Sequence, residues 1–271
     1  MEAESTAGTP ETCLYRIPQR TKDAKGVIEN MSNDVRLIAF DLDGTLTQHK
    51  TPLDEKNRAV LQRLAQRYRL LMIGAGSCTR IFHQMNDFPI DIAGNYGMQF
   101  AQWNAAAQRL ELLRDECVPV DREEAVRRAD ALRARFGLFD YAGDTIEIHA
   151  SGMLTFPLLG TKAALADKLA CDPDRSRRKP MYETVKNAFP EYTVFIGGSS
   201  SFDIVPKPFC KSSALLRYLT DCGLRPENAV YCGDDYGIGG NDRDVYESDV
   251  RFLPIDNYLD FEKRIMESGL L

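Results

Sequence analysis

The sequence lacks long hydrophobic runs, and its cysteines form no C-x-x-C pair. No apolar stretch approaches the roughly 20 residues that a membrane-spanning helix needs, and the N-terminus has no hydrophobic signal core. The 7 cysteines are odd in number, which argues against a disulfide framework or a zinc site and is typical of a reducing compartment. We therefore expect a cytoplasmic protein that does not enter a membrane.

A basic face is also missing. The net charge is −6, and no run of Lys and Arg is interleaved with aromatic residues, so we expect no nucleic-acid partner. One short basic cluster is present, made of Arg175, Arg177, Arg178 and Lys179. We interpret it as a solvated loop or helix start, with phosphate attraction as the alternative.

The chain of 271 residues has 44% hydrophobic and 27% charged residues, which is ordinary for a globular protein of about two domains. Residues 1–33 are polar and are expected to form a mobile leader. Residues 34–112 and 199–271 alternate buried strands with helices, as a parallel α/β core domain does. Between them, residues 113–198 mix helices with a half-exposed hairpin and are predicted to form an inserted α+β cap. Gly197 and Gly198, and the linker over 102–118, are candidate hinges.

The opening stretch of the core is VRLIAFDLDGTLT, residues 35–47. Its apolar run predicts a strand buried on both faces, which is typical of parallel sheets. Asp41 and Asp43 follow one residue apart and should share a pocket at the carboxyl end of the strand. An Asp-Gly pair is also an ordinary turn or cap signal. Two carboxylates this close favour a hard cation such as Mg²⁺ between them.

A second strand over 70–73 ends in Gly74, Ala75, Gly76 and Ser77. A buried strand that leads through a Gly-rich turn into a helix exposes backbone N–H groups that can bind phosphate. Gly76 and the hydroxyl of Ser77 are therefore candidate phosphate-binding groups. Thr79 is interpreted as the N-cap of the following helix.

More acids follow a strand late in the chain. The strand predicted over 228–232 leads into Asp234 and Asp235, and Asn241 and Asp242 come a few residues later. Lys211 begins a predicted core helix and could offset the charge of a phosphoryl group. Lys207 is the alternative cation. Asp41, Asp43 and these later acids are expected to converge.

These motifs resemble those of the haloacid dehalogenase (HAD) superfamily of phosphotransferases. The string D-L-D-G-T-L-T is similar to its first motif, and Ser77 to its second. The resemblance implies that Asp41 is the nucleophile, that Asp43 is the general acid and base, and that Lys211 is catalytic and contacts the phosphate. It further implies Mg²⁺ held by Asp41, Asp234 and the backbone carbonyl of Asp43. Asp235, Asn241 and Asp242 would support the site.

The later motifs, F-D-I-V-P-K-P-F-C-K at 202–211 and G-D-D-Y-G-I-G-G-N-D at 233–242, look like those of the type IIB branch. They are particularly similar to eukaryotic phosphomannomutases, and the similarity spans most of residues 35–265. The implied fold is a Rossmann-like α/β HAD core with an inserted type C2b cap. The implied partner is a small phosphorylated substrate, and a homodimer is left open.

Two departures distinguish the chain from those mutases. The family has an Arg that binds the distal phosphate of the substrate two residues before G-M-L, and this chain has Ala150 there. After the first motif an Arg-containing turn is replaced by Gln48, His49 and Lys50. Losing charge-assisted contacts weakens binding of a second phosphate, so we expect a Mg²⁺-dependent phosphatase of a small metabolite such as a sugar phosphate. A sugar-phosphate mutase is the alternative enzyme.

Two further alternatives concern the function of the chain and the location of His149. A non-enzymatic binding protein on the same scaffold is disfavoured, because every motif residue is present. His149 is interpreted as a surface residue of its strand, and lining of the substrate pocket is the alternative.

Overall fold

The computed structural model describes residues 34–271, and the predicted leader lies outside these residues. Its larger sheet has seven strands in the order β11-β10-β1-β2-β3-β4-β5. The five strands from β11 to β3 are parallel, whereas β4 and β5 form an antiparallel hairpin at one edge. The bounds are β1 Leu37–Phe40, β2 Arg69–Ile73, β3 Asp91–Gly94, β4 Gln99–Asn104, β5 Arg109–Asp115, β10 Ala229–Gly233 and β11 Arg251–Pro254. The parallel α/β core expected from the sequence is therefore present.

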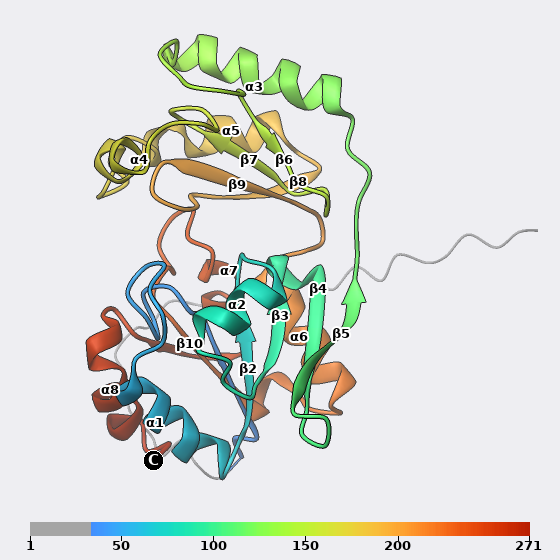
Figure 1. Ribbon diagram of the computed structural model, residues 1–271, viewed down its shortest axis with the longest axis vertical. Helices are drawn as coiled ribbons and strands as arrows, with labels where there is room; N and C mark the ends of the chain where they lie inside the picture. The colour runs from blue at the N-terminus through green and yellow to red at the C-terminus, as the bar shows by residue number, and fades with distance from the viewer. Residues whose placement is uncertain (1–33) are drawn as a thin grey trace, which may run out of the picture.

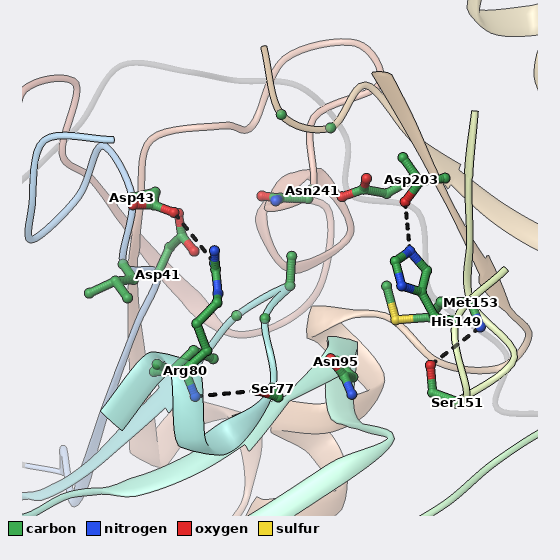
Figure 2. A pocket seen from close by; sticks show the side chains of 18 of the residues that line it. Asp41, Asp43, Ser77, Arg80, Asn95, His149, Ser151, Met153, Asp203 and Asn241 are labelled. Carbon is green, nitrogen blue, oxygen red and sulfur yellow. Dashed lines mark hydrogen bonds and ion pairs between the residues drawn. The ribbon is translucent and has the colours of Figure 1, made fainter. Parts of the chain in front are cut away.

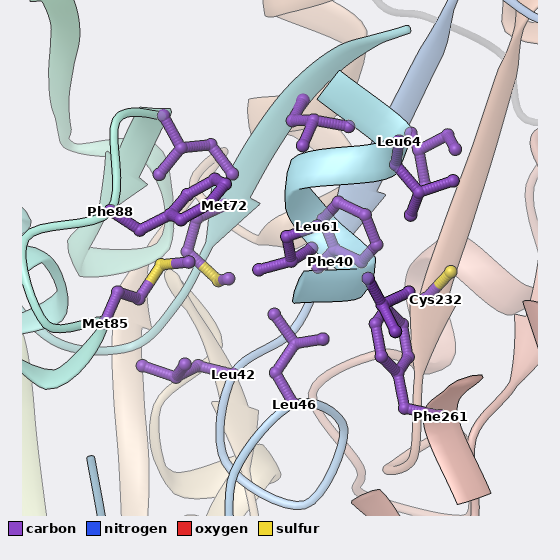
Figure 3. Close-up of a cluster of buried hydrophobic side chains, with 14 of the residues drawn as sticks. Phe40, Leu42, Leu46, Leu61, Leu64, Met72, Met85, Phe88, Cys232 and Phe261 are labelled. Carbon is purple, nitrogen blue, oxygen red and sulfur yellow. The ribbon is translucent and has the colours of Figure 1, made fainter. Parts of the chain in front are cut away.

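Helices cover both faces of this sheet (Figure 1). They are α1 Glu55–Ala65, α2 Cys78–Gln84, α6 Lys211–Asp221, α7 Arg243–Tyr246 and α8 Phe261–Glu267. Alternate residues of β1 face opposite helical layers. Phe40 packs with Leu61 of α1 and Phe261 of α8 on one side (Figure 3), and Ala39 packs with Leu215 of α6 on the other. This two-sided burial explains the nearly unbroken apolar run of β1.

A smaller, antiparallel sheet stands above the carboxyl ends of the parallel strands (Figure 1). Its order is β6-β7-β9-β8. The bounds are β6 Glu147–Ile148, β7 Leu154–Pro157, β8 Tyr192–Phe195 and β9 Ser201–Pro206. With α3 Arg122–Phe136, α4 Leu165–Cys171 and α5 Tyr182–Ala188 it has a hydrophobic core of its own. We call this unit the small domain.

The placement of β9 corrects a prediction. The sequence assigned residues 202–205 to the core sheet, yet β9 pairs with β7 and β8 in the small sheet. Phe202 and Ile204 face the small-domain core, while Asp203 points to the other side. This is the two-residue alternation of a half-exposed strand, so the small domain extends beyond residue 198. At its other end, β5 carries the core sheet past residue 112, to Asp115.

Gly197 and Gly198 are therefore not at a domain hinge. They lie in the turn between β8 and β9, inside the small domain, and the buried Arg178 donates to both of their carbonyls. The chain passes from the core domain to the small domain in the segment that joins β5 to α3. It returns to the core domain in the segment that joins β9 to α6. The N-cap of α2 is Ser77, so the assignment of Thr79 to that position was wrong.

Within residues 34–271, no helix is long and apolar enough to cross a membrane.

Candidate active site

A cavity of about 780 Å³ lies between the two domains, at the carboxyl ends of the parallel strands. Its floor includes Asp41 after β1, Ser77 after β2 and Asp234 after β10. The small domain contributes His149, Asp203 and other residues to the opposite wall, and Figure 2 shows the two walls facing one another. The segments that the sequence singled out thus meet in one place.

Lys211 is fully buried directly behind this floor, in contact with Asp41, and does not itself line the cavity. Its ammonium group lies 2.6 Å from Asp41 Oδ1 and 2.8 Å from Asp242 Oδ1, and it donates to Asn241 Oδ1 at 2.7 Å. The two neighbouring carboxylates outweigh the effect of burial and raise the pKa of Lys211, so the group stays charged. Lys207 instead donates to the carbonyl of Pro190 and is exposed, so the geometry favours Lys211 as the site cation.

Asp41, Asp234 and Asp242 bring carboxylate oxygens within 4.8 Å of one another. Asp242, however, already has donors on both oxygens. Its Oδ1 accepts from Lys211 and from Tyr231 Oη, and its Oδ2 accepts from the amides of residues 234 and 235. Asp242 therefore organises the floor, while Asp41 and Asp234 have capacity for another ligand.

Asp234 is tied to the first motif across the sheet. Its Oδ1 accepts from Thr45 Oγ1 at 3.0 Å. A Cβ at Gly44, where φ is +100°, would lie only 2.4 Å from Asp234 Oδ2. Gly44 is therefore required both by its left-handed backbone and by the close approach of Asp234.

The charge balance of the floor fits a bound divalent cation. Burial raises the pKa of Asp41 well above its usual range, with Asp242 and Asp234 adding to the shift and Lys211 opposing it. Burial and the nearby Asp242 also raise the pKa of Asp234 to about 6. One lysine thus faces three carboxylates, and oxygen ligands of this kind suit Mg²⁺. Asp41 and Asp234 would hold such an ion.

A first prediction follows from the raised pKa of Asp234. Between the unfolded value of 3.8 and the folded value of about 6, the folded protein binds more protons, so the metal-free protein loses stability as pH rises through this range. Asp234→Asn removes that penalty and keeps an acceptor for Thr45. We expect it to stabilise the metal-free protein by about 1–2 kcal/mol at pH 7.5, and by about one-third as much at pH 4.5.

Urea unfolding in the presence of a chelator, at both pH values, measures this effect. Asp130→Asn is the matched control, because Asp130 is exposed on α3. A variant less stable than the parent at pH 7.5 would contradict the prediction.

Asp43 lines the same pocket, but its carboxylate is held by a different set of groups. Its Oδ1 accepts from the amide of Lys50 and from Gln84 Nε2, both at 2.7 Å. Arg80 Nη2 lies 3.9 Å from Oδ2, as the dashed line in Figure 2 marks. The side chain is thus oriented at the pocket edge beside Asp41, where a proton donor or acceptor for a substrate oxygen is needed.

The predicted phosphate-binding turn lies on the neighbouring strand end. Ser77 Oγ accepts from the amide of Arg80 at 3.3 Å and begins α2. Gly76 is in contact with the guanidinium of Arg80, since a Cβ there would lie 2.4 Å from Arg80 Nε. Arg80 is therefore a further cation beside the turn, which the sequence analysis missed although Arg80 is one helical turn after Ser77.

The small-domain wall is mostly neutral or acidic. His149 lines the pocket, and its Nε2 is 2.9 Å from Thr155 Oγ1, so its assignment to the surface was wrong. Ala150 and Ser151 follow at the turn of the hairpin. Asp203 accepts from Tyr96 Oη at 2.8 Å. Among the described small-domain residues that line the pocket, Arg175 is the single Lys or Arg.

The basic cluster is not uniformly solvated, contrary to the sequence-based interpretation. Arg178 is buried against Asp172, with Nε 2.6 Å from Asp172 Oδ2, and Arg175 faces Asp235 in the pocket. Arg177 and Lys179 are exposed, as expected. The carboxylate and carbonyl partners that bury the two arginines come from other segments, which no local pattern reveals.

A family model described as eukaryotic phosphomannomutase matches residues 120–254. The phosphomannomutase of Saccharomyces cerevisiae is 25% identical over 221 residues, which are 78% of this chain and 84% of that protein. The phosphomannomutase of Encephalitozoon cuniculi is 25% identical and covers 89% of this chain and 98% of its own length. The similarity to these enzymes thus includes both domains.

Solved structures share the fold. The IMP-bound, N-terminally truncated IMP-nucleotidase of Plasmodium falciparum has a TM-score of 0.65 at 12% identity, covering 90% of this chain and 70% of that one. A haloacid dehalogenase-like hydrolase of Bacteroides thetaiotaomicron has a TM-score of 0.51 at 15% identity, covering 88% of this chain and all of that one. At such identities the match is one of fold alone.

Proposed function

We propose that this chain, which is similar to phosphomannomutases and shares its fold with a haloacid dehalogenase-like hydrolase, is a HAD-type, Mg²⁺-dependent phosphatase of a small sugar phosphate. The closeness of Asp41, Lys211 and Asp234 supports phosphoryl transfer. The neutral hairpin turn at Ala150 supports hydrolysis of a singly phosphorylated substrate over mutase chemistry. That turn is the observation on which the choice depends.

Asp41 acts as the nucleophile in this proposal. Its carboxylate oxygen attacks phosphorus and forms an aspartyl-phosphate as the bond to the sugar oxygen breaks. Lys211, held 2.6 Å from Asp41, offsets charge on the phosphoryl oxygens. A bound Mg²⁺ would supply further charge neutralisation. Ser77 and the Gly76 turn bind the remaining phosphate oxygens.

Asp43 moves the protons. It gives a proton to the departing sugar oxygen and then takes one from the water that attacks the aspartyl-phosphate. The contacts from Lys50 and Gln84 hold its Oδ1 in place, so Oδ2 is the oxygen available for this transfer. The water restores the Asp41 carboxylate and releases inorganic phosphate.

The hairpin turn yields a second prediction. Ala150→Arg would add a guanidinium to a pocket wall whose present cation, Arg175, is paired with Asp235. Because charge-assisted bonds to phosphate are strong, we expect a hexose bisphosphate to inhibit this variant about tenfold more tightly than the parent.

Inhibition constants measured against hydrolysis of an aryl phosphate test this expectation. Ala150→Gln is the control for side-chain length without charge. Equal inhibition of the Gln and Arg variants would contradict the assignment of this wall to a distal phosphate.

The phosphomannomutase match favours one alternative, a sugar-phosphate mutase. A panel of hexose and pentose phosphates with Mg²⁺, scored for both free phosphate and isomerised sugar, distinguishes the two activities. We expect net phosphate release that a bisphosphate does not stimulate. Conversion of a hexose 1-phosphate to its 6-phosphate, stimulated by bisphosphate and without net release, would instead establish the mutase.

A further inference from the structure

The loop over residues 234–242 is held by the small domain as well as by the core. The amide of Ile196, at the end of β8, donates to the carbonyl of Gly239 at 2.8 Å. A Cβ at Gly239 would lie 2.8 Å from the Ile196 side chain, so the two segments are in close contact. The third contact is the ion pair of Arg175 Nη1 with Asp235 Oδ1, at 2.5 Å. Backbone, side-chain packing and charge thus all cross the domain interface at this loop.

The same loop carries groups of the active site. The backbone carbonyl of Asp235 accepts from the amide of Asp242 at 2.9 Å. The side-chain Oδ2 of Asp235 accepts from the amide of Asn241 at 3.4 Å. Asn241 and Asp242 in turn hold Lys211. Asp235 therefore connects the small domain to the groups that position the lysine.

Arg175 reaches Asp235 from a firmly held segment. Asp172 is buried and accepts from the amide of Arg177 at 2.8 Å and from Arg178 Nε at 2.6 Å. Arg178 also donates to the carbonyl of Ser201 at the start of β9. Arg175 lies inside this clamped turn with a left-handed backbone, φ +59°. The Arg175 side chain is 27% exposed and that of Asp235 is 15% exposed, so solvent screens the pair only partly.

We infer that Arg175 is a positioning residue, which through Asp235 keeps the small domain closed on the 234–242 loop. It does not act on the substrate phosphate, because its guanidinium is neutralised by Asp235. Closure places the small-domain wall over the floor of the cavity. The Arg175–Asp235 ion pair therefore sets the fraction of enzyme molecules that are closed and able to bind substrate. The structural part of this inference stands alone, and its kinetic part rests on the proposed function.

Hydrogen exchange measures closure without substrate, metal or turnover. The Ile196 amide reports on the interface directly, and the amide of Ile204, in the interior strand β9 between β7 and β8, is the internal reference. In Arg175→Gln we expect Ile196 to exchange about 3- to 30-fold faster with Ile204 unchanged, as loss of a coupled contact implies. Asp235→Asn should give the same change, and the double variant should be no worse than either single one.

Arg177→Gln is the matched control, because Arg177 is exposed in the same turn and should leave both amides unaffected. Additive effects in the double variant, or unchanged exchange at Ile196 in Arg175→Gln, would overturn the inference. If the Ile204 amide accelerates equally, the small domain itself has been loosened, and the positioning role is also rejected.

Kinetics provide the second measurement. A smaller closed population should raise KM about 3- to 30-fold in Arg175→Gln, with kcat changed less than KM. A loss confined to kcat would contradict positioning through closure. If the parent shows no phosphate release at all, the proposed function fails, whereas the exchange result still decides whether the interface is coupled.

Discussion

Asp41→Asn should lower phosphate release at least about 1,000-fold, the largest effect expected for any single substitution in this protein. An amide oxygen cannot form the aspartyl-phosphate, and the change removes one of the two carboxylates that hold Lys211. The fold should survive, because Asp242 and Asn241 still bind the ammonium group.

Phosphate release from a sugar phosphate with Mg²⁺ is the measurement, and thermal unfolding verifies that the variant is folded. Asp130→Asn, on the exposed face of α3, makes the same chemical change away from the pocket and should retain full activity. Undiminished release by the folded Asp41→Asn variant would defeat the mechanism.

Lys211→Met should cost about 3–5 kcal/mol of stability as well as activity, because it leaves buried carboxylates without their cation. Lys211 and Asp242 are both fully buried, so water cannot replace the lost interaction. The double variant Lys211→Met/Asp242→Asn removes both buried charges of that pair, and we expect it to recover part of the stability but none of the activity.

Urea unfolding at neutral pH measures the free energies, and Lys207→Met is the matched control. Lys207 is exposed, and its ammonium group donates to the carbonyl of Pro190, so its replacement should cost less than about 1 kcal/mol. If Lys211→Met were as stable as the parent, Lys211 would not be the ion that neutralises the floor.

The sequence was most informative where chemistry and local pattern coincide. The apolar run of β1, ending at Asp41, predicted a central parallel strand with acids at its carboxyl end, and the structure has that arrangement. The hairpin of β6 and β7 was also predicted correctly. These features are encoded within about ten neighbouring residues, so a local reading suffices.

Features that depend on distant partners were misread. β9 was assigned to the core because its apolar residues were counted without weighing the polar Asp203 between them. Arg175 and Arg178 were expected in solvent, since the groups that bury them, Asp235 and the carbonyls after β8, are far along the chain. Gln84, at the end of α2, could not be linked to Asp43 without the packing of that helix.

The strand order also constrains how the protein is made. β1 is flanked by β2 and by β10, and Leu37 is aligned with both Arg69 and Ala229. A nascent chain on the ribosome therefore exposes one edge of its first strand until nearly all of the polypeptide has emerged. By then the small domain, whose strands all lie before residue 207, is complete. Synthesis thus favours folding of the small domain before the core domain, and the slow, non-local pairing of β1 with β10 comes last.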